Sequence, residues 1–121
     1  MASSYDRGMS YDEDLADRIR ELVAAEPALT ERRMFGGLAF LVGGHMAVAA
    51  SGQGGLMVRV DPAESDRLVA TTAARPMEMK GRPMQGWLRV DTASVGTKRQ
   101  LARWVDVGVA YARSLPPKPG R

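Results

Sequence analysis

A Gly-Gly pair between two apolar runs constrains the fold of this chain more than any other sequence feature. Gly43-Gly44 separates the run Arg32–Val42 from the run His45–Ala50. A two-residue hairpin turn often needs positive φ angles, which glycine reaches without a clash of its side chain. The pattern therefore predicts a β-hairpin in which the two runs are antiparallel strands.

The first run is apolar on both faces, which is typical of a strand in the interior of a sheet. Gly36 and Gly37 interrupt this run and leave two side chains missing. Glycines inside strands usually mark a bulge or the close approach of another backbone, and a bound ligand is the other interpretation. We expect the structural cause, and we also keep both glycines as candidate binding residues.

Two amphipathic segments flank the predicted strands. Residues 10–26 begin with a capping box, carry apolar residues at helical spacing and end at Pro27. Residues 97–115 begin with a capping box formed by Thr97 and Gln100, and Gly108 lies on their apolar stripe. Because glycine costs a helix about 1 kcal/mol relative to alanine, Gly108 predicts that this helix approaches the sheet closely.

The remaining pattern completes an α+β fold. Alternating residues predict further strands at 56–60, 75–80 and 84–91, with a short helix at 61–69, and Pro76 favours an edge strand. We therefore predict a five-stranded antiparallel sheet flanked by N- and C-terminal helices plus one short helix, in the order α-β-β-β-α-β-β-α. Residues 1–9 are expected to form a flexible leader, 10–115 the domain and 116–121 a basic tail.

Composition narrows the function classes. The chain has no cysteine and one histidine, which disfavours disulfides, thiolate metal sites, histidine-based metal sites and a Ser-His-Asp triad. An enzyme would depend on His45, Glu78 and Asp91, and nothing in the sequence brings them to one cleft. We therefore expect a protein that is not an enzyme and has no cofactor and no metal. The lack of a signal-peptide pattern and of a bilayer-length apolar run predicts a cytoplasmic protein with no membrane contact.

Charge is unevenly distributed along the chain. Residues 1–74 contain 7 Lys or Arg and 11 Asp or Glu, whereas residues 75–121 contain 10 and 3. The basic second half is compatible with an acidic partner or with an ordinary solvated surface. The candidate contact residues are five cations: Arg33, Arg59, Lys80, Arg82 and Arg89. Because no helix-turn-helix, zinc finger or aromatic RNA-binding pattern is present, we do not expect direct sequence-specific DNA binding.

The run Arg32-Arg33-Met34-Phe35-Gly36-Gly37, the later strand Leu56–Asp61, and the positions of Trp87 and Trp104 resemble the N-terminal domain of the TfoX/Sxy family. The similarity covers residues 10–115. It implies an antiparallel sheet flanked by helices and a stand-alone, single-domain bacterial member of the family. Longer members are positive regulators of DNA-uptake competence that work with an activator of the cyclic-AMP receptor protein type. The resemblance therefore implies a protein partner in the transcription machinery.

Two functions follow as expectations. The first is a non-enzymatic regulatory or interaction domain, with a homodimer through its sheet edges as a further expectation. The alternative is a small-molecule-binding domain with an apolar pocket near Gly36-Gly37 and the methionines, which line adaptable sites well. A Cu(I) site formed by Met77, Met79 and Met84 is a third and weaker interpretation, because thioethers suit that ion.

Overall fold

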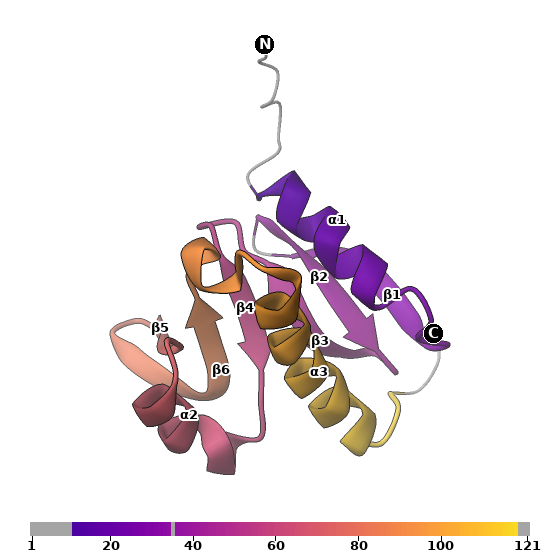
Figure 1. Ribbon diagram of the computed structural model, residues 1–121. Helices are drawn as coiled ribbons and strands as arrows, with labels where there is room; N and C mark the ends of the chain where they lie inside the picture. The colour runs from indigo at the N-terminus through magenta and orange to yellow at the C-terminus, as the bar shows by residue number, and fades with distance from the viewer. Residues whose placement is uncertain (1–10, 35, 119–121) are drawn as a thin grey trace.

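The computed structural model describes residues 11–34 and 36–118, and these residues adopt the predicted α+β fold (Figure 1). In these residues, three α-helices and six strands follow one another in the predicted order, with one additional strand. The α-helices and strands are α1 (Glu13–Leu22), β1 (Leu29–Met34), β2 (Gly37–Val42), β3 (His45–Ala50), β4 (Leu56–Arg59), α2 (Ser65–Thr71), β5 (Arg75–Met79), β6 (Arg82–Val90) and α3 (Lys98–Ser114). Short 3₁₀ turns at Pro62–Glu64 and Thr92–Val95 precede α2 and α3.

The sheet is antiparallel throughout, with the strand order β1-β2-β3-β4-β6-β5. Strands β1, β2 and β3 each pair with the next strand along the chain. Strand β6 then pairs with β4, so β5 lies outside it at the edge of the sheet. This placement confirms the edge position that Pro76 predicts, since proline cannot donate to a neighbouring strand.

The predicted first strand is in fact two strands, so the sheet has six strands and not five. Strand β1 pairs with β2 up to the contact of Met34 with Gly37, and Gly36 in the intervening turn has a φ of 78°. The residues of β1 are exposed or half-buried and mostly polar. Because β1 is an edge strand whose side chains mostly face solvent, it has no apolar pattern, and its first residues resemble a linker in the sequence.

The central hairpin forms as predicted. Every residue of β2 is buried, and Val42 pairs with His45 across the turn. Gly43 and Gly44 both have positive φ angles, of 61° and 86°. The two glycines therefore supply the backbone conformation that a two-residue turn requires.

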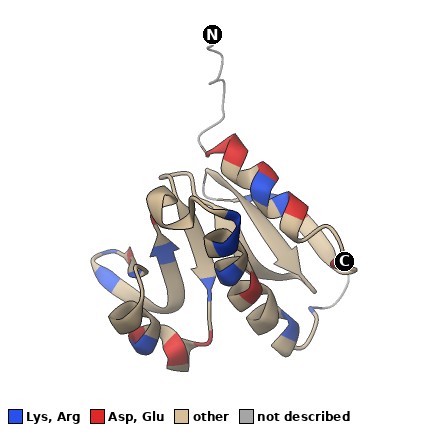
Figure 2. Ribbon diagram, viewed as in Figure 1, with Lys and Arg blue, Asp and Glu red and all other residues tan. Residues whose placement is uncertain are grey.

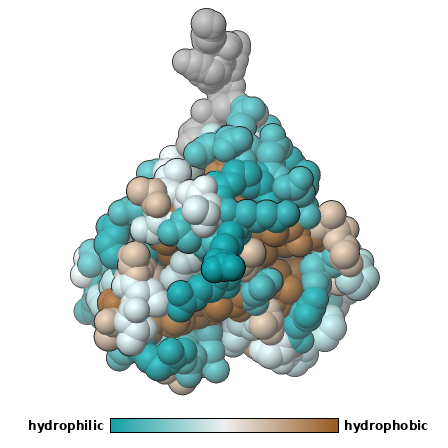
Figure 3. Space-filling view, viewed as in Figure 1, coloured by the Kyte–Doolittle hydropathy of each residue, from teal (hydrophilic) through white to brown (hydrophobic). Residues whose placement is uncertain are grey.

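Helices α1 and α3 cover one face of the sheet, where the main hydrophobic core lies (Figure 1). The glycine on α3 makes close packing possible: a Cβ atom at Gly108 would lie 2.3 Å from the carbonyl oxygen of Ala47 in β3. This confirms the predicted close approach of the last helix to the sheet. On the side seen in Figure 3, hydrophilic residues cover most of the surface, with hydrophobic residues showing between them.

Capping residues mark the starts of α1 and α3. Thr97 and Gln100 form both hydrogen bonds of the predicted capping box at the start of α3. Asp12 caps α1 by accepting from the backbone N–H of Leu15 at 3.1 Å. The predicted cap Ser10 and the predicted leader lie outside the described residues. No helix in the described ranges has the length and apolarity that a membrane-spanning helix needs.

The segment after α3 returns to the central hairpin. The imidazole Nε2 of His45 lies 2.7 Å from the carbonyl oxygen of Pro116, and the backbone N–H of Lys118 donates to the carbonyl of Gly43 at 2.9 Å. Residues 116–118, the described part of the predicted tail, are therefore held against the turn between β2 and β3.

The sheet face opposite α1 and α3 is here called the open face. No helix contributes to the small hydrophobic cluster on this face, among the residues that the structure describes. The cluster consists of buried strand residues, with Met34, Met77 and Trp87 packed against it; its buried members are Ala39, Leu41, Met46, Ala49 and Met57.

Candidate functional site

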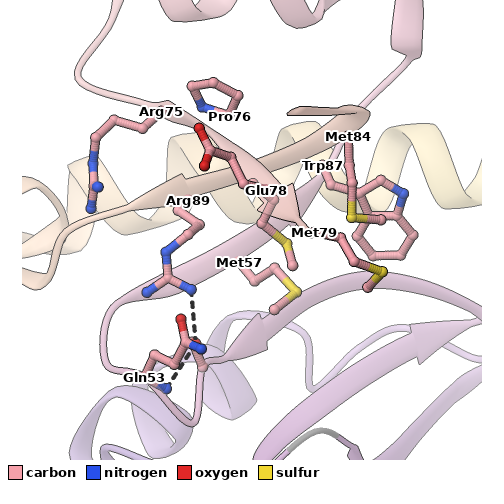
Figure 4. Close-up of a pocket in the computed structure, with 11 residues that line it drawn as sticks. Gln53, Met57, Arg75, Pro76, Glu78, Met79, Met84, Trp87 and Arg89 are labelled. Carbon is pink, nitrogen blue, oxygen red and sulfur yellow. Dashed lines mark hydrogen bonds between the residues drawn. The ribbon is translucent and has the colours of Figure 1, made fainter. Parts of the chain in front are cut away.

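A cavity of about 660 Å³ lies on the open face, where the β5–β6 hairpin and β4 meet the loop after β3. We call it the groove (Figure 4). Its volume is within the range of sites that bind small organic molecules. Eleven residues line it: Ser51, Gln53, Met57, Arg75, Pro76, Met77, Glu78, Met79, Met84, Trp87 and Arg89.

One part of the groove is an apolar wall of methionines and an aromatic ring. Met77 and Met84 are direct cross-strand partners on β5 and β6, and both are half-buried. Trp87 is also half-buried, whereas Met79 is 51% exposed and is the large hydrophobic residue most open to solvent in the described chain. Methionine side chains are flexible and polarizable, so this wall can adapt to ligands of different shape.

The polar part of the groove is organised around Arg89. Its guanidinium donates to the Oγ atom of Ser51 at 3.2 Å and to the carbonyl oxygen of Gly54 at 3.0 Å. Ser51 is 3% exposed, and its Oγ also accepts from the backbone N–H of Gln53 at 3.1 Å. The glycine-rich loop between β3 and β4 therefore positions an arginine, and it leads into a strand and not into the helix that phosphate loops require.

Arg89 also belongs to a row of side chains that crosses the open face. Met57 on β4 pairs with Arg89 on β6, which pairs in turn with Arg75 on β5. Residues directly opposite each other in an antiparallel pair lie on the same face of the sheet. Two cations are therefore placed side by side, and Arg75 is neutralised by Asp91 at 2.5 Å.

The two candidate glycines have structural roles and lie outside the groove. A Cβ atom at Gly37 would lie 2.3 Å from the carbonyl oxygen of Ala50, so close packing of the backbones explains this glycine. The cavity next to it measures only about 10 Å³, which is about enough for one water molecule. Methionines line the groove, and neither Gly36 nor Gly37 is among its lining residues.

The five candidate cations do not form one surface. Arg33 lies on β1 at one edge of the sheet, whereas Lys80 and Arg82 lie at the turn of the β5–β6 hairpin at the other edge. The guanidinium of Arg59 lies 5.0 Å from the ring centre of Trp87 and 5.6 Å from that of Tyr111. Arg89 is the candidate that lines the groove.

Charges of both signs are mixed on the helix-bearing side of the molecule, as Figure 2 shows. Several basic residues are paired with acids there: Arg20 with Asp17 and Glu31, and Arg113 with Glu26. Arg113 belongs to the basic second half of the sequence and Glu26 to the acidic first half, so this pair balances part of the uneven charge in space, which favours the solvated-surface interpretation.

The residues considered for catalysis have different partners in the structure. His45 contacts Pro116, and Asp91 pairs with Arg75, while Glu78 lies on the groove lining. Within the described ranges, no three His, Asp or Glu side chains are close enough together to hold a metal ion.

Sequence reasoning associated the methionines with a pocket and named Arg89 for a charged contact surface, and it did not name Trp87, Ser51 or Arg75 for either. Met57 and Arg89 are 32 positions apart in the sequence and become neighbours because β4 pairs with β6. The alternation of apolar and polar residues in these two strands indicates which side chains share a face, but it does not say which strands are neighbours.

Comparison with known proteins places this fold in a family. The family model described as the TfoX N-terminal domain matches residues 21–112, from the end of α1 to the last part of α3, which includes the whole sheet and the groove. A search of curated proteins finds no match. Since the family match covers well over half of the chain and agrees with the residues that suggested it, the chain belongs to the TfoX N-terminal domain family.

Proposed function

We propose that this protein is a non-enzymatic regulatory domain that binds a small organic molecule in the groove. The observation that carries the proposal is the cavity of about 660 Å³ with an apolar wall and a few polar groups at one end. Small-molecule sites in proteins combine these features, because apolar contacts provide affinity and polar groups fix orientation.

The chemistry of the groove supports binding and not catalysis. General acid–base catalysis requires titratable groups that converge on one reacting atom. The groove lining contains Glu78 and no histidine, and the imidazole of His45 is held by Pro116 at another place in the fold. The methionines and Trp87 of the groove offer apolar contacts to a ligand, and the hydrogen-bonded Arg89 offers a positive charge.

A fluorescence titration with N-phenyl-1-naphthylamine tests this proposal, because this uncharged apolar dye fluoresces more strongly when it leaves water. We expect the wild-type protein to increase the fluorescence in a saturable manner. Met79→Lys places a charge on the apolar wall at an exposed position, so it should weaken the binding without unfolding the protein. Ala110→Lys adds the same charge on the exposed side of α3 and should bind like the wild type.

Two results would overturn the proposal. One is the absence of any saturable fluorescence increase with the wild-type protein. The other is equal binding by the wild type and Met79→Lys, because the dye would then be bound somewhere other than in the groove. Thermal melting curves of both variants verify that each is folded.

A second candidate function is a regulatory domain that binds a protein of the transcription machinery. It is favoured by the exposure of Met79 next to its cross-strand partner Arg82, since methionine and arginine are both enriched at protein interfaces. Biolayer interferometry with purified bacterial RNA polymerase and with a cyclic-AMP receptor protein type activator tests this candidate. Binding that Met79→Lys weakens would support it, and the absence of binding to either protein would rule it out.

A further inference from the structure

We propose that the ligand of the groove is an organic monoanion: a carboxylate on an apolar body, with the carboxylate bound by Arg89. This inference rests on the proposed small-molecule function and adds the chemical class of the ligand. It is carried by three observations, which concern the pairing of Arg89, the position of Arg75 and the residue next to Arg89 on the sheet.

Arg89 is a cation whose hydrogen-bond partners are neutral. The acceptors of its guanidinium are the Ser51 hydroxyl and the Gly54 carbonyl, and no described carboxylate forms an ion pair with it. These two bonds use two of the five N–H donors of the guanidinium. They also hold the planar group in place, so the remaining donors are ordered before a ligand arrives, which favours binding of a carboxylate.

Arg75 lies beside Arg89 at the same end of the groove, and an acid already neutralises it. It pairs directly with Arg89 on the neighbouring strand, and both side chains line the cavity. Like charges directly opposite each other destabilise a sheet. Asp91 compensates Arg75 at 2.5 Å, so Arg89 is the member of the pair that an incoming anion would neutralise.

The apolar part of the ligand is specified by what lies next to the guanidinium. Met57 is the cross-strand neighbour of Arg89 and is 9% exposed. The wall of Met77, Met84 and Trp87 continues from it, so an anionic head on Arg89 directs the rest of the molecule along thioethers and an indole ring (Figure 4). A small inorganic anion would leave this wall in contact with water, whereas an amphipathic anion would cover it.

Glu78 limits the charge of the ligand. It is the acidic residue of the lining and lies exposed on the edge strand β5. In Figure 4 its carboxylate and the Arg89 guanidinium lie apart. A carboxylate with a single charge suits one unneutralised arginine next to an acidic rim better than a doubly charged phosphate does.

Displacement of N-phenyl-1-naphthylamine by decanoate, decanol and decyl phosphate tests this inference with the full chain. These compounds share one alkyl chain and differ in the head group. Because hydrogen bonds to a charged group are stronger than those to a neutral one, we expect decanoate to displace the dye at a concentration about ten-fold or more below that of decanol. Arg89→Gln should remove most of this advantage and leave displacement by decanol unchanged.

The control variants distinguish the loss of the Arg89 charge from a change in the shape of the groove. Arg103→Gln removes a positive charge from an exposed position of α3 and should behave like the wild type. Arg89→Lys should retain part of the decanoate advantage, since lysine keeps the charge and loses the planar fork. If Arg89→Gln weakens decanoate and decanol equally, Arg89 only maintains the shape of the groove and the inference is wrong.

The outcomes distinguish this inference from the function on which it rests. Equal potency of decanoate and decanol with the wild-type protein would overturn the anion assignment, while the groove would still bind apolar molecules. Tighter binding of decyl phosphate than of decanoate would overturn the choice of a monoanion. If the dye itself does not bind, the small-molecule function fails, and this inference fails with it.

Discussion

Gly108 of α3 lies directly over Ala47 of β3, so close that a side chain on the glycine would overlap the Ala47 carbonyl oxygen. A glycine in the middle of a 17-residue helix is unfavourable for helix formation. Here it allows the helix backbone to rest on the sheet backbone, which closes the core at the centre of the molecule. The packing of α3 against the sheet therefore depends on the residue at position 108 having no Cβ atom.

Gly108→Ala should destabilise the protein although alanine is the better helix former. The added Cβ would lie 2.3 Å from a backbone oxygen that cannot rotate away, so α3 must shift from the sheet. We expect a loss of about 1–3 kcal/mol in the free energy of unfolding, the usual cost of overpacking a core. Urea denaturation followed by circular dichroism measures it. Ala110→Gly, at an exposed position of the same helix, should cost about 1 kcal/mol through helix propensity alone, and a stabilising Gly108→Ala would contradict the packing described.

Gly37→Ala should destabilise the protein in a similar way at the edge of the central hairpin. A Cβ atom there would lie 2.3 Å from the Ala50 carbonyl oxygen and 2.9 Å from the Gly52 backbone nitrogen. The expected cost is about 2 kcal/mol, again measured by urea denaturation. Gly96→Ala is the matched control, because Gly96 has a φ of −70° and a Cβ atom added there would lie 3.7 Å from the carbonyl oxygen of Ala93, an ordinary contact distance. This control should be neutral or stabilising by up to about 1 kcal/mol.

The ion pair between α1 and the edge strand β1 should make stability depend on pH. The Arg20 guanidinium donates to both carboxylate oxygens of Glu31, at 2.6 and 2.9 Å, and these hydrogen bonds lower the pKa of Glu31 from its ordinary value of 4.5. A lowered folded-state pKa means that the stabilisation is complete above the pKa of the unfolded chain. It is lost as the pH falls through the folded-state value.

Glu31→Gln should therefore be less stable than the wild type near pH 7, and the difference should shrink as the pH falls below about 4.5. Because the pair is partly exposed, we expect a difference below about 1 kcal/mol. Urea titrations at several pH values measure it. The double variant Arg20→Gln/Glu31→Gln should lose less than the sum of the two single variants, and strict additivity would show that the pair does not interact.

Oxidation should distinguish the methionines of the open face. Met79 is 51% exposed, whereas Met57 and Met46 are 9% and 6% exposed. Sulfoxide formation follows access to the sulfur, so dilute hydrogen peroxide should modify Met79 well before Met57 and Met46. Peptide mass spectrometry over time measures the order, and oxidation of the three residues at equal rates in the folded protein would contradict the groove described. In urea-unfolded protein the differences should disappear.

Local patterns made much of the fold predictable. Gly43-Gly44 predicted a hairpin, Thr97 and Gln100 predicted the start of the last helix, and Pro76 predicted an edge strand; each signal depends only on residues nearby in the sequence. Strand β1 was not recognised as a separate strand, because its exposed charges give no apolar alternation. The sequence pattern of Arg32–Val42 therefore suggested one strand where the chain turns at Gly36.

The groove was predictable only in part, for a related reason. The methionines of residues 77–84 lie on one hairpin, so their proximity follows from local pairing. The apolar lining outside this hairpin is Met57 on β4. This strand pairs with β6 although β5 lies between the two in the sequence. Whether Met57 or another side chain stands beside Arg89 depends on this long-range register, which no short pattern encodes.

The strand order has a consequence for biosynthesis. Strands β1 to β4 can associate in the order in which the ribosome releases them, because each lies beside its predecessor. The next strand to emerge, β5, has no partner until β6 has been made. A nascent chain that stalls before residue 82 would therefore expose the unpaired side of β4 and be prone to aggregation, and the groove could form only after β6 has been made.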